Sequence, residues 1–257
     1  MPAVFFGHGS PMNTFADNAV TRAWQEFGAT VPRPRAILAI SAHWFINASA
    51  VTAMERPRTI HDFFGFPKEL FEFEYPAPGD PSLAAEVIDT VDPVWIGLDR
   101  DSWGLDHGTW SVLHHAFPAA DIPVVQLSVH AAQPIEYHVA LGRALAPLRD
   151  AGVLIVGSGN VVHHLGVLDW NLAEEGFDWA HRFDDTVRDI MTSAPGDLAR
   201  VAEHPDVTKA VPTPDHFLPV AYIAGLAAAT GEPAELLFQS YAYGSLSMTS
   251  YVVPAAA

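Results

Sequence analysis

Short apolar runs alternate along this chain with longer segments whose apolar residues recur at helical spacing. The runs predict buried strands, at Ala3–Phe6, Ala36–Ile40, Val51–Met54, Val124–Ser128, Val153–Val156 and Leu236–Phe238. The spacing and helix-start residues between them predict helices, at Asp17–Phe27, Ser82–Val91, Pro134–Ala151, Trp179–Thr192 and Pro214–Ala229. Strands that alternate with helices indicate the α/β class. We expect a single domain over residues 1–257, with a central mixed β-sheet and helices on both faces.

One segment departs from this alternation. Residues Thr59–Pro78 are rich in aromatic side chains and contain Gly65, Pro67, Pro76 and Pro78. This composition predicts a long excursion over the sheet, and such excursions in compact domains are often binding loops.

Composition narrows the classes of partner. The chain has 257 residues, 49% of them hydrophobic, which is enough apolar material for a large core. With 13 Lys and Arg against 30 Asp and Glu, the net charge is −17. A phosphate backbone or an anionic membrane needs a basic face, so we expect neither nucleic acid nor membrane as a partner. The sequence contains neither a signal peptide nor a run of about 18 apolar residues, so we expect a cytoplasmic protein.

The chain contains 13 histidines and no cysteine. The lack of cysteine excludes disulfides, iron–sulfur clusters and Cys-ligated zinc. Any transition-metal site must therefore use histidine together with aspartate or glutamate.

Three histidines follow predicted strands at the point where each strand ends. His8 follows the first strand, His43 follows the second, and His163 lies a short turn beyond Val153–Val156. Ligands of open α/β sheets bind at the carboxyl ends of the strands, so these side chains are expected to converge on one cleft. His216, at the start of a predicted helix, and His107, in WGLDHGTW, are further candidates.

Several other chemistries lack their sequence signals. The chain has no GxSxG elbow, no GKS or GKT phosphate loop, no GxGxxG after a strand and no HExxH zinc helix. These absences argue against a hydrolase of the nucleophile-elbow type, an NTPase, a dinucleotide-binding enzyme and a zinc protease.

Five segments taken together resemble the 4,5-DOPA extradiol dioxygenase family, which belongs to the class III extradiol ring-cleaving dioxygenases of the LigB-like superfamily. They are GHGSPMN, SAHW, WGLDHGTW, SGNVVHH and PTPDHFLP, and the later GSLSM is similar too. The resemblance runs from His8 to Met248. Each segment alone is a weak signal, whereas five in this order are specific.

The resemblance implies a role for each candidate histidine. His8, His43 and His216 match the metal-binding positions. His163 matches the histidine over the substrate, the expected acid–base group, and zinc-bound members of the family also use it as a fourth ligand. His107 matches a histidine that orients a ligand or contacts the substrate. The wider superfamily binds Fe²⁺ through two histidines and a glutamate, whereas the third position here is His216, so one Zn²⁺ or Fe²⁺ per chain remains open.

The implied reaction is metal-dependent cleavage of the aromatic ring of DOPA or a related catechol by O₂. The product is a ring-opened semialdehyde, which is 4,5-seco-DOPA when the substrate is DOPA. Such a reaction needs open metal positions and a base that titrates near neutrality, a task that suits His163. Phe63, Phe64 and Phe66 in the aromatic segment are expected to suit a flat ring, and Trp44 and Trp110 are expected to wall its pocket.

Two other functions remain open at this point. The first is a zinc hydrolase that activates water with the same histidines. The second is a non-catalytic binding protein of the Memo type, which keeps the fold and loses the chemistry. The sequence is compatible with a monomer or a homodimer, and it does not identify a group that would bind a substrate carboxylate.

Overall fold

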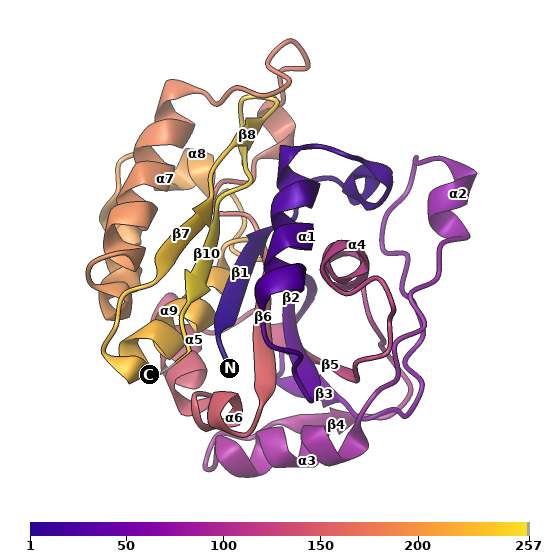
Figure 1. The fold of residues 1–257 in the computed structure, drawn as a ribbon. Helices are drawn as coiled ribbons and strands as arrows, with labels where there is room; N and C mark the ends of the chain where they lie inside the picture. Colours follow the sequence, from indigo (N-terminus) through magenta and orange to yellow (C-terminus); the bar gives the residue numbers. More distant parts are fainter. Residues whose placement is uncertain (256–257) are drawn as a thin grey trace.

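An eight-stranded mixed sheet forms the centre of the computed structural model, which describes residues 1–255 (Figure 1). The strand order is β4-β3-β5-β2-β6-β1-β10-β7. The strands are β1 (Ala3–Gly7), β2 (Ala36–Ile46), β3 (Ala50–Thr52), β4 (Gly97–Asp99), β5 (Val124–His130), β6 (Val153–Gly159), β7 (Glu235–Phe238) and β10 (Ser250–Val253). A small separate pair is formed by β8 (Tyr241–Ala242) and β9 (Leu246–Ser247).

The four middle strands β5, β2, β6 and β1 run parallel to one another. They are almost entirely buried because helices cover the sheet on both faces, as is typical of parallel sheets. Their carboxyl ends therefore lie along one edge of the sheet. β10 pairs with the other edge of β1 and runs antiparallel to it.

Two layers of helices pack on the sheet. The longer helices are α1 (Ala19–Thr30), α3 (Pro81–Thr90), α4 (His107–Ala116), α5 (Ile135–Ala144), α7 (Asp178–Met191) and α9 (Leu218–Thr230). Helices α1 and α4 share one apolar core, and α3, α5, α7 and α9 share the other (Figure 1). The predicted α/β class, with a mixed sheet covered on both faces, is confirmed. Within residues 1–255, no helix has both the length and the apolar character needed to cross a membrane.

Several short elements connect these layers. The short α-helices are α2 (Lys68–Phe71), α6 (Pro147–Asp150) and α8 (Val207–Ala210). The 3₁₀ helices are η1 (Pro11–Phe15), η2 (Leu165–Val167) and η3 (Pro195–Glu203). Most of the predicted excursion Thr59–Pro78 is irregular, and α2 lies within it.

Two predicted helices differ markedly from the structure at one end. The helix expected over Pro134–Ala151 is split into α5 and α6, because Pro147 lacks an N–H and its ring cannot continue the preceding helix. The helix expected from Pro214 begins at Leu218, and residues 212–217 form turns. His216 therefore lies just before α9 rather than inside its first turn.

A candidate metal centre built from histidines

Five histidines converge at the carboxyl edge of the parallel strands. His8 directly follows β1, as predicted. His43 lies inside β2 rather than after it, because this strand continues past the predicted end at Ile40 to Ile46. His107 is the first residue of α4, where the buried Asp106 caps the helix by accepting from the N–H of Thr109. The last two, after β6 and before α9, are His163 and His216. The sequence prediction that these histidines converge is thus met by the fold.

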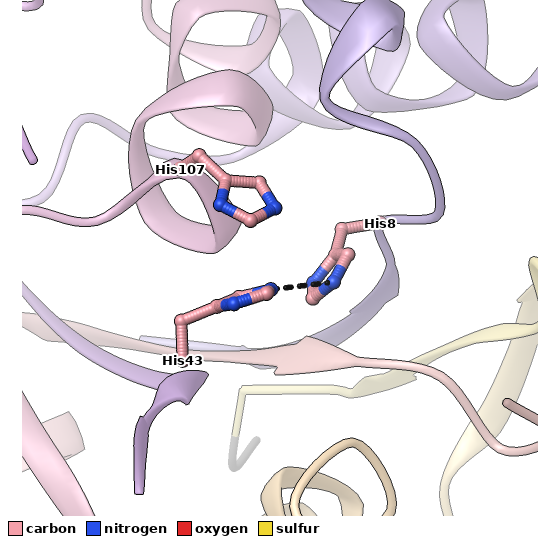
Figure 2. A group of neighbouring side chains, drawn as sticks. All are labelled: His8, His43 and His107. Carbon is pink, nitrogen blue, oxygen red and sulfur yellow. Dashed lines mark hydrogen bonds between the residues drawn. The ribbon is translucent and has the colours of Figure 1, made fainter. Parts of the chain in front are cut away.

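The rings are in direct contact. The centroid of His43 lies 3.8 Å from that of His107, 5.1 Å from His8 and 5.0 Å from His216. Within residues 1–255, His8, His43 and His107 form a group of possible ligands whose nitrogens lie within 4.8 Å of one another. Figure 2 shows these three rings turned toward a common centre from β1, β2 and α4. The choice between His107 and His216 as the third ligand stays a prediction.

The orientation of His8 is fixed through Ser158 on β6. The Ser158 hydroxyl donates its hydrogen to the carbonyl oxygen of Gly108. Its oxygen must therefore accept from the Nδ1–H of His8, 2.9 Å away. This leaves the lone pair of His8 on Nε2, which points into the cluster.

Carboxylates fix three other rings. Asp62 places one oxygen 2.8 Å from the Nδ1 of His43 and the other 2.8 Å from the Nδ1 of His107. Asp215 accepts in the same way from the Nδ1 of His216. Histidines that bind metals usually hold their outer nitrogen in such a bond, which fixes the tautomer and leaves Nε2 for the ion.

Burial and the carboxylates set the charges in the cluster. Burial, followed by the neighbouring His43, holds the pKa of His8 well below its usual range. Burial also lowers the pKa of His216 to about 4, although Asp215 opposes this effect. Burial opposes charge on His43 as well, but the hydrogen bond and charge of Asp62 prevail and raise its pKa. Burial alone would raise the pKa of Asp62. The hydrogen bonds from His107 and His43 outweigh burial and leave the pKa of Asp62 below its usual value, so Asp62 is an anion.

The hydrogen bonds at the Nδ1 atoms of His8 and His43 favour a cation between their Nε2 atoms. The Nε2 atoms of His8 and His43 lie only 3.2 Å apart (Figure 2, dashed line). With both Nδ1 atoms used as outward donors, two lone pairs would face each other if both rings were neutral. A proton or a metal ion must therefore lie against this pair. Imidazole nitrogens suit Zn²⁺ and Fe²⁺, so the donor set fits the metal that the sequence predicts.

Glycines allow the close packing behind the rings. A Cβ on Gly108 would lie 2.5 Å from the Ser41 hydroxyl oxygen and 2.8 Å from Cδ2 of His43. A Cβ on Gly7 would lie 2.5 Å from the backbone of Met248. Gly7, next to His8, and Gly108, next to His107, are therefore steric requirements of the site.

The excursion Thr59–Pro78 borders the histidines, as predicted, through Phe63, which the sequence singled out, and through Asp62, which it did not. Asp62 contacts two histidine rings, and the Phe63 ring packs edge-on against His107 with centroids 5.3 Å apart.

The other predicted pocket aromatics differ in where they lie. Trp110 is buried beside Phe63 and His107, with ring centroids 6.2 Å and 6.4 Å away. Phe64 is 92% exposed, because the chain turns outward at Gly65, where φ is +79°. Phe66 packs on Phe63, and Trp44 is buried in a parallel stack on Trp103. Of these three phenylalanines, Phe63 is the one against the cluster.

His163 lies beside His216 rather than apart from the ligand positions. Their rings are parallel and 3.5 Å apart. Burial, followed by His216, lowers the pKa of His163 far below its usual range, so this ring is neutral at neutral pH. A neutral imidazole at this place can accept a proton or bind a metal.

The comparisons with known proteins identify the family. The profile described as "Catalytic LigB subunit of aromatic ring-opening dioxygenase" matches residues 6–254. The chain belongs to the LigB family. The predicted resemblance, and with it the assignment to the ring-cleaving dioxygenases, is confirmed.

Named relatives and a solved structure agree with this placement. The chain is 46% identical over 254 residues to the 4,5-DOPA dioxygenase extradiol of Escherichia coli K12, covering 97% of this chain and 93% of that protein. It is 37% identical over 258 residues to the Beta vulgaris protein of the same name, covering 96% and 94%. The crystal structure of an uncharacterized E. coli K12 protein superposes with a TM-score of 0.86 at 41% identity, covering 99% of this chain and all of that one.

Proposed function

We propose that this protein is a metal-dependent extradiol dioxygenase that opens the ring of DOPA or a related catechol. The observation that carries the proposal is the convergence of the Nε2 atoms of His8 and His43, 3.2 Å apart, with their outer nitrogens held by Ser158 and Asp62. Relatives named 4,5-DOPA dioxygenase extradiol align with nearly the whole chain and support this substrate class.

In this reaction both atoms of O₂ enter the product, and the bond beside the two hydroxyl-bearing carbons breaks. The catechol supplies the electrons, so no further reductant is needed. When bound, the metal lowers the pKa of a phenol hydroxyl and offers positions for the catechol oxygens and for O₂. Fe²⁺ is the ion that we propose for turnover, because Zn²⁺ has no redox chemistry.

Residues of this chain handle the protons. His163 is neutral and only partly covered, so it accepts a proton from a catechol hydroxyl and later returns it to the product. His107, held by Asp62 at Nδ1, has a nitrogen in the same group as those of His8 and His43 and is the proposed second contact to the substrate. Phe63 covers His107 and offers an apolar surface to a flat ring.

A zinc hydrolase remains the alternative, because carboxylates behind histidines, such as Asp62 and Asp215 here, also occur in zinc enzymes. That enzyme would activate water at the same cluster. It would consume no O₂ and give no coloured ring-opened product.

The test is anaerobic loading with Fe²⁺, followed by O₂ uptake on DOPA and other catechols, with His43→Ala as the metal-site control. The expected result is one O₂ consumed per catechol and a yellow product with wild type, and neither with His43→Ala. Fe²⁺-loaded wild type that consumes no O₂ with any catechol would contradict the proposal. Hydrolysis by the Zn²⁺ form would then support the alternative.

A further inference from the structure

One carboxylate connects two histidines of the candidate site. Asp62 Oδ2 lies 2.8 Å from the Nδ1 of His43, and Oδ1 lies 2.8 Å from the Nδ1 of His107. Oδ1 also accepts from the backbone N–H of His107 at 3.2 Å. The His43 and His107 rings are the closest pair within the tight group of three, with centroids 3.8 Å apart.

We propose that Asp62 is a positioning residue that holds a metal-binding histidine, His43, and a substrate-facing histidine, His107, in one fixed relative orientation. The role assigned to His107 rests on the proposed function, whereas the link from Asp62 to His43 needs only a metal site. Metal binding and substrate handling thus depend on the same side chain.

Only a carboxylate can satisfy both rings at once. Each imidazole must donate its Nδ1–H outward if its Nε2 is to keep a lone pair for the interior. Asp62 offers an acceptor oxygen to each. Asparagine of the same shape offers one acceptor and one N–H₂ donor, so one of the two rings would face a donor. That ring would carry its proton on Nε2, the nitrogen that must be free, or turn away.

The segment around Asp62 is held on both sides, as a positioning residue requires. Before it, the carbonyl oxygen of Ile60 accepts from the indole N–H of Trp110 at 2.9 Å. On the adjacent residue, Nε2 of His61 lies 2.9 Å from the carbonyl oxygen of Phe73. After it, Phe63 packs on His107. The aromatic segment that borders the substrate space is therefore attached to the metal-binding histidine through Asp62.

The first experiment compares wild type, Asp62→Asn and the matched control Glu69→Gln, which removes one negative charge from an exposed site on the same segment. Isotope-edited NMR of the imidazole nitrogens reports their protonation, and competition with a chelator reports Zn²⁺ affinity. We expect Nδ1–H on His43 and His107 in wild type and in Glu69→Gln. Asp62→Asn should shift one ring to Nε2–H and weaken Zn²⁺ binding about 10–100-fold.

The second experiment separates positioning from general damage to the fold. In the Fe²⁺-loaded enzyme, Asp62→Asn should lower kcat while KM changes little, and Asp62→Glu, which keeps both acceptor oxygens, should recover part of the loss in kcat and Zn²⁺ affinity. Asp62→Asn with wild-type tautomers, Zn²⁺ affinity and kcat would overturn the proposal.

Two outcomes remain decisive if other parts fail. Should Asp62→Asn not fold, the absence of an Nδ1–H from His43 or His107 in wild type would by itself refute the proposed role. Should wild type cleave no catechol, the tautomers and Zn²⁺ affinity still test Asp62 independently of the proposed reaction.

Discussion

His163 lies flat on His216, with the two ring planes 4° from parallel and their centroids 3.5 Å apart. The family resemblance assigns one of these residues to proton transfer and the other to the metal. Because the rings are in van der Waals contact, position alone does not divide these roles. Metal content and turnover have to be measured on the same variant.

His163→Ala should lower turnover about 10²–10⁴-fold, the usual contribution of a general acid–base group, and keep most of its metal. Metal analysis beside O₂ uptake provides the measurement, and His181→Ala, an exposed histidine on α7, is the matched control. Joint loss of metal and activity would identify His163 as a fourth ligand. Unchanged activity with metal retained would refute proton transfer by this residue.

Gly108→Ala should weaken metal binding about 10–100-fold, an effect comparable with the loss of an outer partner of a ligand. Alanine favours a helix over glycine by about 1 kcal/mol, but its Cβ would overlap Ser41 and displace His43. Gly196→Ala is the control, because its Cβ would make ordinary contacts at 3.4 Å. Chelator competition measures the affinity, and an unchanged value for Gly108→Ala would show that His43 tolerates the displacement.

The charge around the site should discriminate among catechols. Asp62 and Asp215 lie behind the histidines, and residues 160–178 contain four carboxylates and no Lys or Arg. Lys68, on the aromatic segment, is already paired with Glu72 at 2.5 Å. A field of this sign attracts cations and repels anions.

The kcat/KM for dopamine, which carries an ammonium, should therefore be about tenfold or more higher than the kcat/KM for 3,4-dihydroxyphenylpropionate. The value for zwitterionic DOPA should lie between the two. Added salt should reduce the difference, since it screens exposed charges. A preference for the propionate at low salt would point to a cationic residue that binds the substrate carboxylate.

His138 should make the fold sensitive to acid at a place remote from the metal. Its Nδ1 lies 3.0 Å from the Tyr222 hydroxyl, and within residues 1–255 its buried Nε2 has no hydrogen-bond partner. Burial lowers its pKa from 6.5 to about 4. Between these values the unfolded chain binds a proton that the native chain does not, so stability falls as pH falls, by up to about 1.4 kcal/mol per pH unit.

Urea unfolding of the metal-free protein at about pH 7 and pH 5 measures this effect. Wild type should lose more stability on acidification than His138→Gln, which cannot titrate. Equal losses would show that His138 takes no part in acid destabilisation.

The sequence predicted the parallel strands and the histidines at their ends because both signals are local. A buried strand is a short apolar run, and in a parallel sheet the residues at its carboxyl end lie at the binding edge. The sequence also contained the signal for the break at Pro147. The prediction missed this break because apolar residues at helical spacing continue on both sides of the proline. β4 was missed because it is only three residues long and gains its place by pairing with β3.

Asp62 and Ser158 could not be identified in the same way. Each acts on a histidine far away in the sequence, and a lone aspartate in an aromatic loop resembles any solvated loop residue. The one available signal for Asp62 was its position between His61 and Phe63, in a segment already expected to border the site. Asp215 was closer to recognition, because it directly precedes His216. Phe63 packs on His107, whereas its neighbour Phe64 is exposed. Which of two adjacent phenylalanines faces the site depends on the backbone conformation, and the sequence alone does not give it.

The position of β10 has a consequence for biosynthesis. β1 leads into His8, and its two neighbours in the sheet, β6 and β10, come from the middle and the far end of the sequence. The chain therefore cannot complete the sheet around the histidines until residues 250–253 have left the ribosome. All five histidines are translated before residues 250–253. The four parallel strands that bring these histidines together all precede β10 in the sequence, so β10 adds the antiparallel pairing on the other side of β1 to a carboxyl edge whose strands are already translated.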